Sequence, residues 1–345
     1  MFNWSLNADS GLYAWSLIFS AWLLERLLPI SSAIDPIAFF RFVCTRMAIK
    51  VLPAEKQSQQ HYISGVLAIV VLVIPIGLIV YLISQFASYQ WLFNLIVLYL
   101  ALQLSGQLHL VKKIADAVKR NKKQLARDLL STQVLRDTSA LSMVGISKAS
   151  IEMISLRISF QHATTLALAL LLSPLFALCY RLCYEAAQTW NVKLNRYARF
   201  GYFSSRLCFV LQWLPTRFYA LLLVLINFPA NGLNALKACF TRQSLLSCNA
   251  NIIYAAVSGV LNTHVSGAIR YEQSLNQEKN QNVNHQTKSN QDQISETITV
   301  RRHKYFGRDE PAASDIFRIV NAHNRTMLVY LMFLLFISFA VNANV

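Results

Sequence analysis

The chain has 345 residues, of which 55% are hydrophobic and only 14% are charged. Soluble globular domains carry about 25% charged residues, so this composition excludes a protein surrounded only by water. The formal net charge is +16, but no aromatic residues alternate with the basic ones as stacking on nucleic-acid bases requires. We therefore expect an integral membrane protein with the lipid bilayer as its partner and no nucleic acid.

Three apolar runs fill the first part of the chain, at residues 11–30, 62–84 and 91–111. Each is about 20 residues long, which is enough for a helix to cross a bilayer. The first run lacks a basic leader and a small-residue cleavage site, so it predicts a retained helix and not a signal peptide. Residues 1–111 are thus predicted to form an N-terminal membrane region with three spans.

The basic residues are concentrated in residues 31–61 and 112–163, whereas the link at residues 84–90 has none. Cytoplasmic loops of membrane proteins are enriched in Lys and Arg, so both basic segments are predicted to be cytoplasmic and the N-terminus outside. Residues 112–163 are read as one basic cytoplasmic segment, whose first part has the apolar period of a helix lying on an anionic leaflet.

The second half of the chain is less regular. Residues 164–270 are predicted to be re-entrant or interfacial helices, because full spans would leave the basic stretch 185–206 outside. Full spans remain the alternative. Residues 271–300 are rich in Asn, Gln, Lys and Ser, which predicts a flexible polar insertion. Residues 301–345 contain a last span that leaves the C-terminus outside.

The predicted fold is therefore all-α: a polytopic integral membrane protein with about four transmembrane helices plus re-entrant or interfacial helices. The expected location is the inner (plasma) membrane of a bacterium, with basic loops in the cytoplasm and both termini outside. The 6 Cys show no spacing typical of metal ligands and are expected to be small buried hydrophobes. The sequence leaves any metal site unknown.

Short motifs between the apolar runs form an ordered set that covers most of the chain. They are Glu25-Arg26-Leu27-Leu28, Ala126-Arg127, Val134 with Arg136-Asp137-Thr138, Ala149 with Ile151-Glu152, Pro174 with residues 177–181, residues 197–217 with Trp213 and Pro215, Ser247 with Asn249-Ala250, and residues 305–316. In this order they resemble the CobD/CbiB membrane proteins of cobalamin biosynthesis, the adenosylcobinamide-phosphate synthases.

The resemblance implies a reaction and a set of residues for it. The reaction is ATP-dependent formation of an amide bond between adenosylcobyric acid and aminopropanol or its phosphate. The implied cofactors are ATP and Mg²⁺, and the implied partners are the corrinoid and aminopropanol-type substrates. Asp137 and Glu152 are the implied catalytic acids. The residues implied to bind substrate or phosphate are Arg127, Arg136, Lys148, Arg181, Ser247 and Asn249.

The chain departs from the family at several acidic positions. Leu156, Arg157, Phe160 and Gln161 stand where the family has a second Glu, an Asn and an Asp-Gly. The loss leaves an alternative open, a non-catalytic AmpE-like inner-membrane sensor of the same scaffold with a membrane protein as partner. Whether the chain is an enzyme is therefore undecided by sequence. A transporter is disfavoured, because no pair of broken helices carries charges at mid-bilayer depth.

Each implied site residue also has a purely structural interpretation. Asp137 or Thr138 is suited to capping the helix that follows. Glu152 is placed for an i,i+4 pair with Lys148. Arg181 lies at an apolar run from which it can extend to lipid headgroups.

Overall fold

A computed structural model describes residues 8–30, 35–52, 58–227, 249–267, 269–274, 295–300, 304–305, 307 and 309–343. Within them the regular secondary structure is helical except for two antiparallel ladders of two strands each and one isolated bridge between Thr263 and Asp309. This confirms the prediction of an all-α fold.

The helices are α1 (Ala8–Leu27), α2 (Pro36–Val51), α3 (Ser58–Phe86), α4 (Gln90–Leu102), α5 (Ser105–Lys119), α6 (Lys123–Ser131), α7 (Met143–Leu156), the π-helix η1 (Arg157–Ala163), α8 (Thr164–Leu171), α9 (Pro174–Thr189), the 3₁₀ turn η2 (Asn195–Tyr197), α10 (Tyr202–Asn227), α12 (Asn249–Leu261) and α13 (Ala313–Ala343). The strands are β1 (Val265–Ser266), β2 (Ile269–Ser274), β3 (Ser295–Val300) and β4 (Lys304–Tyr305); β1 pairs with β4 and β2 with β3.

Five helical stretches of the described chain are long and apolar enough to cross a membrane. They are Gln59–Phe86, Gln90–Lys119, Met143–Leu171, Tyr202–Asn227 and Ala313–Phe339. They support the prediction of a multi-pass membrane protein.

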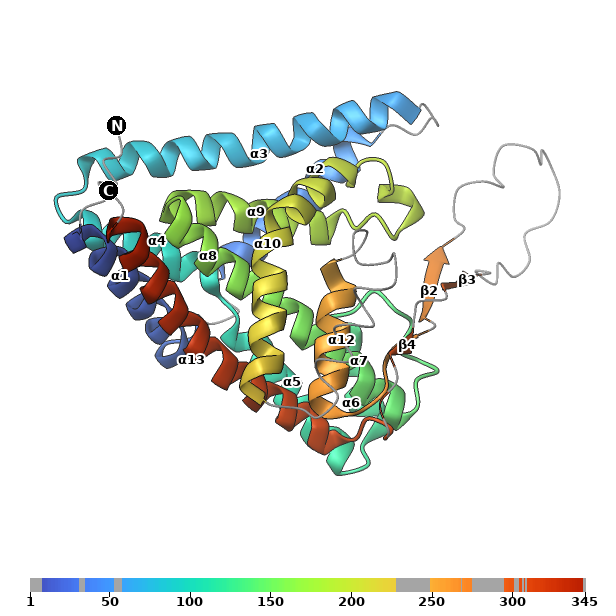
Figure 1. Cartoon of the computed structure of the whole chain (residues 1–345). Helices are drawn as coiled ribbons and strands as arrows, with labels where there is room; N and C mark the ends of the chain where they lie inside the picture. The colour runs from blue at the N-terminus through green and yellow to red at the C-terminus, as the bar shows by residue number, and fades with distance from the viewer. Residues whose placement is uncertain are drawn as a thin grey trace, which may run out of the picture.

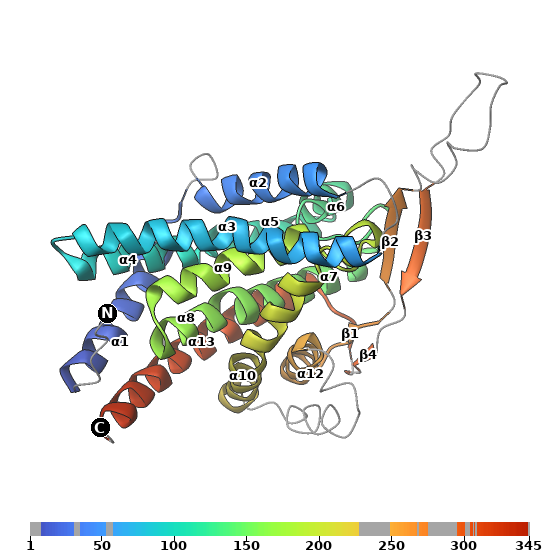
Figure 2. The same cartoon turned by 90° about the horizontal axis from the view of Figure 1, so that it is seen from above.

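Helices α1 and α13 lie side by side along one edge of the molecule, and α3 runs along another (Figure 1). Trp15 donates to the carbonyl of Leu331 at 2.8 Å, and Arg26 donates to Asn324 at 2.9 Å, so α1 and α13 are antiparallel. Figures 1 and 2 both place α7, α12 and β4 at the end of the molecule away from the chain termini, and β1 pairs with β4 there.

Helices α7, η1 and α8 form one continuous helix through the centre of the bundle. Its most apolar window is 78% buried inside the protein, far more than in the other four candidate spans. The predicted boundary at residue 163 therefore does not match the structure, because the helix runs across it. Many of its polar residues, among them Ser150, Glu152 and Thr164, are buried inside the protein, so its low hydropathy is that of a helix in the interior of the bundle.

The region predicted as re-entrant is divided differently by the structure. α8 ends at Leu171, and Ser173 caps α9 by accepting a hydrogen bond from the backbone N–H of Phe176 at 3.1 Å. The long central helix therefore turns back into the shorter α9 at residues 172–173. α10 is continuous through Pro215 and long enough to span, where a broken or interfacial helix was predicted.

The predicted insertion at residues 271–300 is also shorter than expected. Its two flanks pair as strands, with Ile269 opposite Val300 and Ser274 opposite Ser295. The remaining part of the predicted insertion, residues 275–294, lies outside the described residues.

Candidate functional site

A buried ion pair joins the loop before α7 to α7 itself. Arg136 Nη2 lies 2.5 Å from Glu152 Oε2, with 13% and 1% of the two side chains exposed. The other oxygen of Glu152 accepts a hydrogen bond from the backbone N–H of Ser266 at 3.0 Å. One carboxylate therefore connects three parts of the chain. A charge is tolerated at this depth only when it is paired and hydrogen-bonded, as this one is.

The backbone around Ser266 is strained. Ser266 has φ 65° and Asn262 has φ 57°, both in the left-handed region, and Gly267 has φ 118°. A non-glycine residue held there costs on the order of 1–3 kcal/mol, and such residues cluster at functional sites. The hydroxyls of Thr263 and Ser266 are buried and have no hydrogen-bond partner. The turn whose backbone contacts Glu152 thus carries two unused hydroxyls.

A second loop holds this turn in place. The backbone N–H of Asp309 donates to Asn262 O at 3.2 Å, and that of His264 donates to Asp309 O at 3.1 Å. A Cβ on Gly307 would lie 2.3 Å from the carbonyl carbon of Asn262, so only glycine fits. The Ser266 backbone that meets Glu152 is therefore set by residues about 40 positions later in the chain.

Asp137 has a different role from Glu152. Its Oδ1 accepts from the backbone N–H of Ser139 at 2.8 Å and from the Ser139 hydroxyl at 2.6 Å, which shapes the loop before α7. The prediction that Asp137 or Thr138 caps the next helix is wrong, because Ser142 is the cap. A cap must lie directly before the first helical turn, and α7 begins only at Met143.

Two further residues implied to bind substrate, Arg127 and Lys148, lie on the helices before and after the loop that carries Arg136. Arg127 donates from Nε and Nη2 to the carbonyl oxygen of Leu141 at 3.0 and 2.6 Å. Arg127 and Arg136 thus hold the same loop from its two ends. Lys148 is half-buried on α7, one turn before Glu152.

The structure brings Asn249 to a separate cluster at the start of α12. Its Oδ1 accepts from Arg217 Nη1 at 3.0 Å, and its Nδ2 donates to Phe209 O at 2.9 Å. The Arg217 guanidinium lies 4.2 Å above the Trp213 ring. These contacts join α12 to α10 through the motif at residues 213–217. Ser247 lies outside the described residues.

Arg181 belongs to another group of charges, on α9 and α2. Its Nη1 lies 2.7 Å from Glu185 Oε1, and Arg41 Nε lies 3.7 Å from Glu185 Oε2. Arg181 is only 1% exposed, so it does not extend to lipid headgroups as its structural interpretation predicted. The carboxylate of Glu185 compensates the positive charge of the buried Arg181 side chain.

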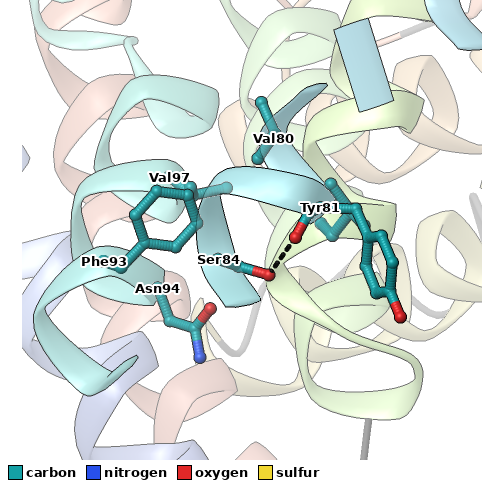
Figure 3. Close-up of a pocket in the computed structure, with 7 residues that line it drawn as sticks. Val80, Tyr81, Ser84, Phe93, Asn94 and Val97 are labelled. Carbon is teal, nitrogen blue, oxygen red and sulfur yellow. Dashed lines mark hydrogen bonds between the residues drawn. The ribbon is translucent and has the colours of Figure 1, made fainter. Parts of the chain in front are cut away.

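One pocket lies outside the clusters described above. It lies where α3 and α4 meet, with Ser84 and Tyr81 of α3 beside Phe93 and Asn94 of α4 (Figure 3). No charged residue lines it. We therefore assign it no chemistry.

The family model described as CobD/Cbib protein matches residues 18–300. The chain belongs to the CobD/CbiB family. A protein of Chromobacterium violaceum named "Cobalamin biosynthesis protein CobD" is 28% identical over 256 residues, 73% of this chain and 81% of that protein. One of the same name from Stutzerimonas stutzeri is 27% identical over 260 residues, 75% and 84% of the two chains. No solved structure matches.

This member of the CobD/CbiB family does not offer the expected magnesium ligands. Mg²⁺ in phosphoryl-transfer sites is held by carboxylates together with substrate phosphates. Both oxygens of Glu152 are already bound, and Asp137 is directed to Ser139. Among the described residues no three His, Cys, Asp or Glu side chains form a group suited to a metal ion. The residues present therefore do not fit a carboxylate-held Mg²⁺.

Sequence reasoning missed the turn that meets Glu152. Thr263 and Ser266 were not candidates, although Gly307 stood within the motif at residues 305–316. A Ser-Gly pair at residues 266–267 after a predicted helix was the available signal for a turn. The contact with a glutamate 114 positions earlier has no local signature.

Proposed function

We propose that this chain catalyses the amide-forming step of cobalamin biosynthesis, joining a carboxylate of adenosylcobyric acid to the amine of aminopropanol or its phosphate. Membership in the CobD/CbiB family, and relatives named cobalamin biosynthesis proteins, connect the chain with that pathway. The structural observation that supports the reaction is the buried Arg136–Glu152 pair against the strained turn at Ser266. Strain and buried charge together are typical of a reaction site.

The reaction requires three things. The amine nitrogen forms a bond to the acyl carbon, an oxygen leaves that carbon, and the nitrogen loses a proton. A free carboxylate is a poor acyl donor, so the departing oxygen must first be made a leaving group. We propose ATP as the activating co-substrate on the family resemblance. Because the described residues do not fit Mg²⁺, no step is assigned to a metal.

Arg136 is the residue suited to the anionic substrate. A guanidinium binds carboxylate and phosphate oxygens with two parallel hydrogen bonds. In the structure Arg136 is bound to Glu152, so substrate binding exchanges one carboxylate partner for another. Arg127, which holds the same loop, positions Arg136 through the backbone at Leu141.

Glu152 is then the group that accepts the proton from the amine. Once Arg136 turns to the substrate, the Glu152 oxygen that Arg136 occupied becomes available to accept the proton. The backbone N–H of Ser266 contacts Glu152, and the turn at residues 263–266 carries the unpartnered hydroxyls of Thr263 and Ser266. They are suited to hydrogen bonding with an amide or carbonyl oxygen of the substrate.

Complementation tests the proposal. A strain that lacks the amidation step, grown where growth depends on corrinoid, should grow with the wild-type chain. Glu152→Gln keeps the shape but cannot accept the proton, so the rate of corrinoid amidation should fall by about 10²–10⁴-fold. Asp128→Asn, on the exposed face of α6, is the matched control and should grow normally. Growth that survives Asp137→Ala combined with Glu152→Ala would contradict the site assignment.

The alternative is a non-catalytic AmpE-like sensor of the same scaffold with a membrane protein partner. The observation that favours it is the lack of a carboxylate group for a metal among the described residues. The same strain decides between the two. A wild-type chain that inserts into the membrane in normal amount and supports no growth excludes the amide-forming enzyme.

A further inference from the structure

Three hydrogen-bonded side chains join three helices inside the bundle, one turn beyond Glu152. His323 has a partner at each ring nitrogen: the Tyr219 hydroxyl lies 2.9 Å from Nδ1, and the Ser155 hydroxyl lies 3.0 Å from Nε2. The three side chains come from α10, α13 and α7, and none is more than 1% exposed. The imidazole therefore connects the central helix to two helices packed against it.

Ser155 bonds differently from another buried serine of the same helix. Ser150 donates to the carbonyl oxygen of Ile146 at 2.9 Å, one turn back within α7. Serine hydroxyls inside helices commonly bond to their own backbone in this way. The Ser155 hydroxyl bonds across to α13, so it contributes to how α7 is held in the bundle.

His323 lies in a helix that is long and apolar enough to cross a membrane. Ionisable side chains are rare in such helices, face the interior of the bundle and frequently serve a function. Each hydroxyl partner can donate or accept, so a neutral imidazole is satisfied in either tautomer. His323 also lies beyond residues 18–300, so the family match does not include it.

Ser155 lies three residues after Glu152 on α7, and side chains three residues apart are neighbours on one face of a helix. A helix turns as a unit, so the bond that fixes the direction of Ser155 also fixes the direction of Glu152. The proposed reaction makes such an anchor necessary. When Arg136 turns to the substrate, Glu152 loses that contact and keeps the hydrogen bond from Ser266. The bond from His323 does not depend on Arg136 and continues to hold α7.

We propose that His323 is a positioning residue, which acts through Ser155 to hold α7 in the rotation that directs Glu152 to the substrate amine. This inference rests on the proposed function, in which Glu152 accepts the proton of the amine. The bond to Ser155 carries the effect, whereas the bond to Tyr219 joins α13 to α10. Removing each bond alone should therefore give different results.

Two amide variants of His323 separate the two bonds. A glutamine side chain places its amide near the position of Nε2 and can still bond to Ser155, whereas an asparagine places its amide near Nδ1 and can still bond to Tyr219. His323→Asn should lower kcat for corrinoid amidation by about 10²-fold with little change in KM, because a displacement of about 1 Å has that effect on a reacting group. His323→Gln should keep kcat close to wild type. Each variant loses one hydrogen bond, so a purely structural role would affect both alike.

A second pair of variants leaves the imidazole in place. Ser155→Ala removes the bond to α7 and should lower kcat as His323→Asn does. Ser150→Ala is the matched control, because it removes an equally buried hydroxyl from the same helix and should leave kcat unchanged. Equal losses of kcat in His323→Asn and His323→Gln, or a normal kcat in Ser155→Ala, would overturn the proposal.

Thermal unfolding of the full-length protein in detergent tests the positioning without the reaction. Arg136→Met should lower the unfolding midpoint by leaving Glu152 without its cation. That decrease should be smaller in the His323→Asn background, where Glu152 is no longer directed at Arg136, and unchanged in the His323→Gln background. Absence of amidation by the wild-type chain would contradict the proposed function alone. Equal decreases in the two backgrounds would contradict the positioning role.

Discussion

At the scale of single residues, Glu152 decides how the candidate site is built. Its two oxygens bind a guanidinium from the preceding loop and a backbone N–H from a strained turn. Neither contact is an i,i+4 pair within α7. The carboxylate is thus a junction between distant segments, and its neighbours should respond strongly when its charge is left unpaired.

Replacing Arg136 alone should show how strongly the stability of the protein depends on the Arg136–Glu152 pair. Arg136→Met leaves the carboxylate of Glu152 buried without this cation, which should cost about 3 kcal/mol. Arg136→Met combined with Glu152→Leu removes both charges and should recover most of that loss. Thermal unfolding in detergent measures both. Equal stability of the single and double variants would contradict the expectation that the loss comes from the Glu152 charge left without Arg136.

At the scale of elements, glycines mark where backbones touch. Gly65 of α3 packs on Phe200, where an added Cβ would lie 2.0 Å from the carbonyl oxygen. Gly307 packs in the same way on Asn262, next to the strained turn at Ser266. The apolar periodicity of the helices does not predict these contacts between distant segments. Gly106 of α5 has no atom within 4 Å of an added Cβ.

The two kinds of glycine give a matched pair of variants. Gly307→Ala should push the turn at Asn262 away and reduce both the unfolding midpoint and corrinoid amidation. Gly106→Ala should leave both unchanged or raise stability by about 0.5–1 kcal/mol, because alanine favours the helix. Amidation rate and unfolding are measured on the same preparations. Normal amidation in Gly307→Ala would mean that the turn does not belong to the site.

At the scale of the whole molecule, the antiparallel packing of α1 and α13 constrains the topology. It places the beginning of α1 and the end of α13 on the same side of the bundle. That arrangement agrees with the hypothesis that both termini lie outside. Together with that hypothesis, the basic residues at the turn between α5 and α6 predict that this turn is cytoplasmic.

Labelling from the outside tests this topology. With the 6 Cys replaced by Ser, a cysteine added at either terminus should react with an impermeant maleimide in intact cells. Lys122→Cys, at the turn between α5 and α6, should react only after permeabilisation. Termini that label from opposite sides would contradict the antiparallel α1–α13 pair.

The sequence by itself determined the fold class and the family. Long apolar runs leave a backbone no option in lipid but helix, and the ordered motifs indicated the CobD/CbiB family before any geometry. It also identified Arg136 and Glu152 as residues of interest, because a charged residue stands out against an apolar background.

Only the tertiary structure decided which of those residues meet. It paired Arg136 with Glu152, directed Asp137 to Ser139, and moved Arg181 and Asn249 into other clusters. It also showed that residues 143–171 form one helix whose most apolar window is 78% buried inside the bundle. Local sequence determines which helices form. Contacts such as that between Glu152 and the Ser266 backbone, 114 positions apart, depend on how those helices pack, and no short window of sequence contains that information.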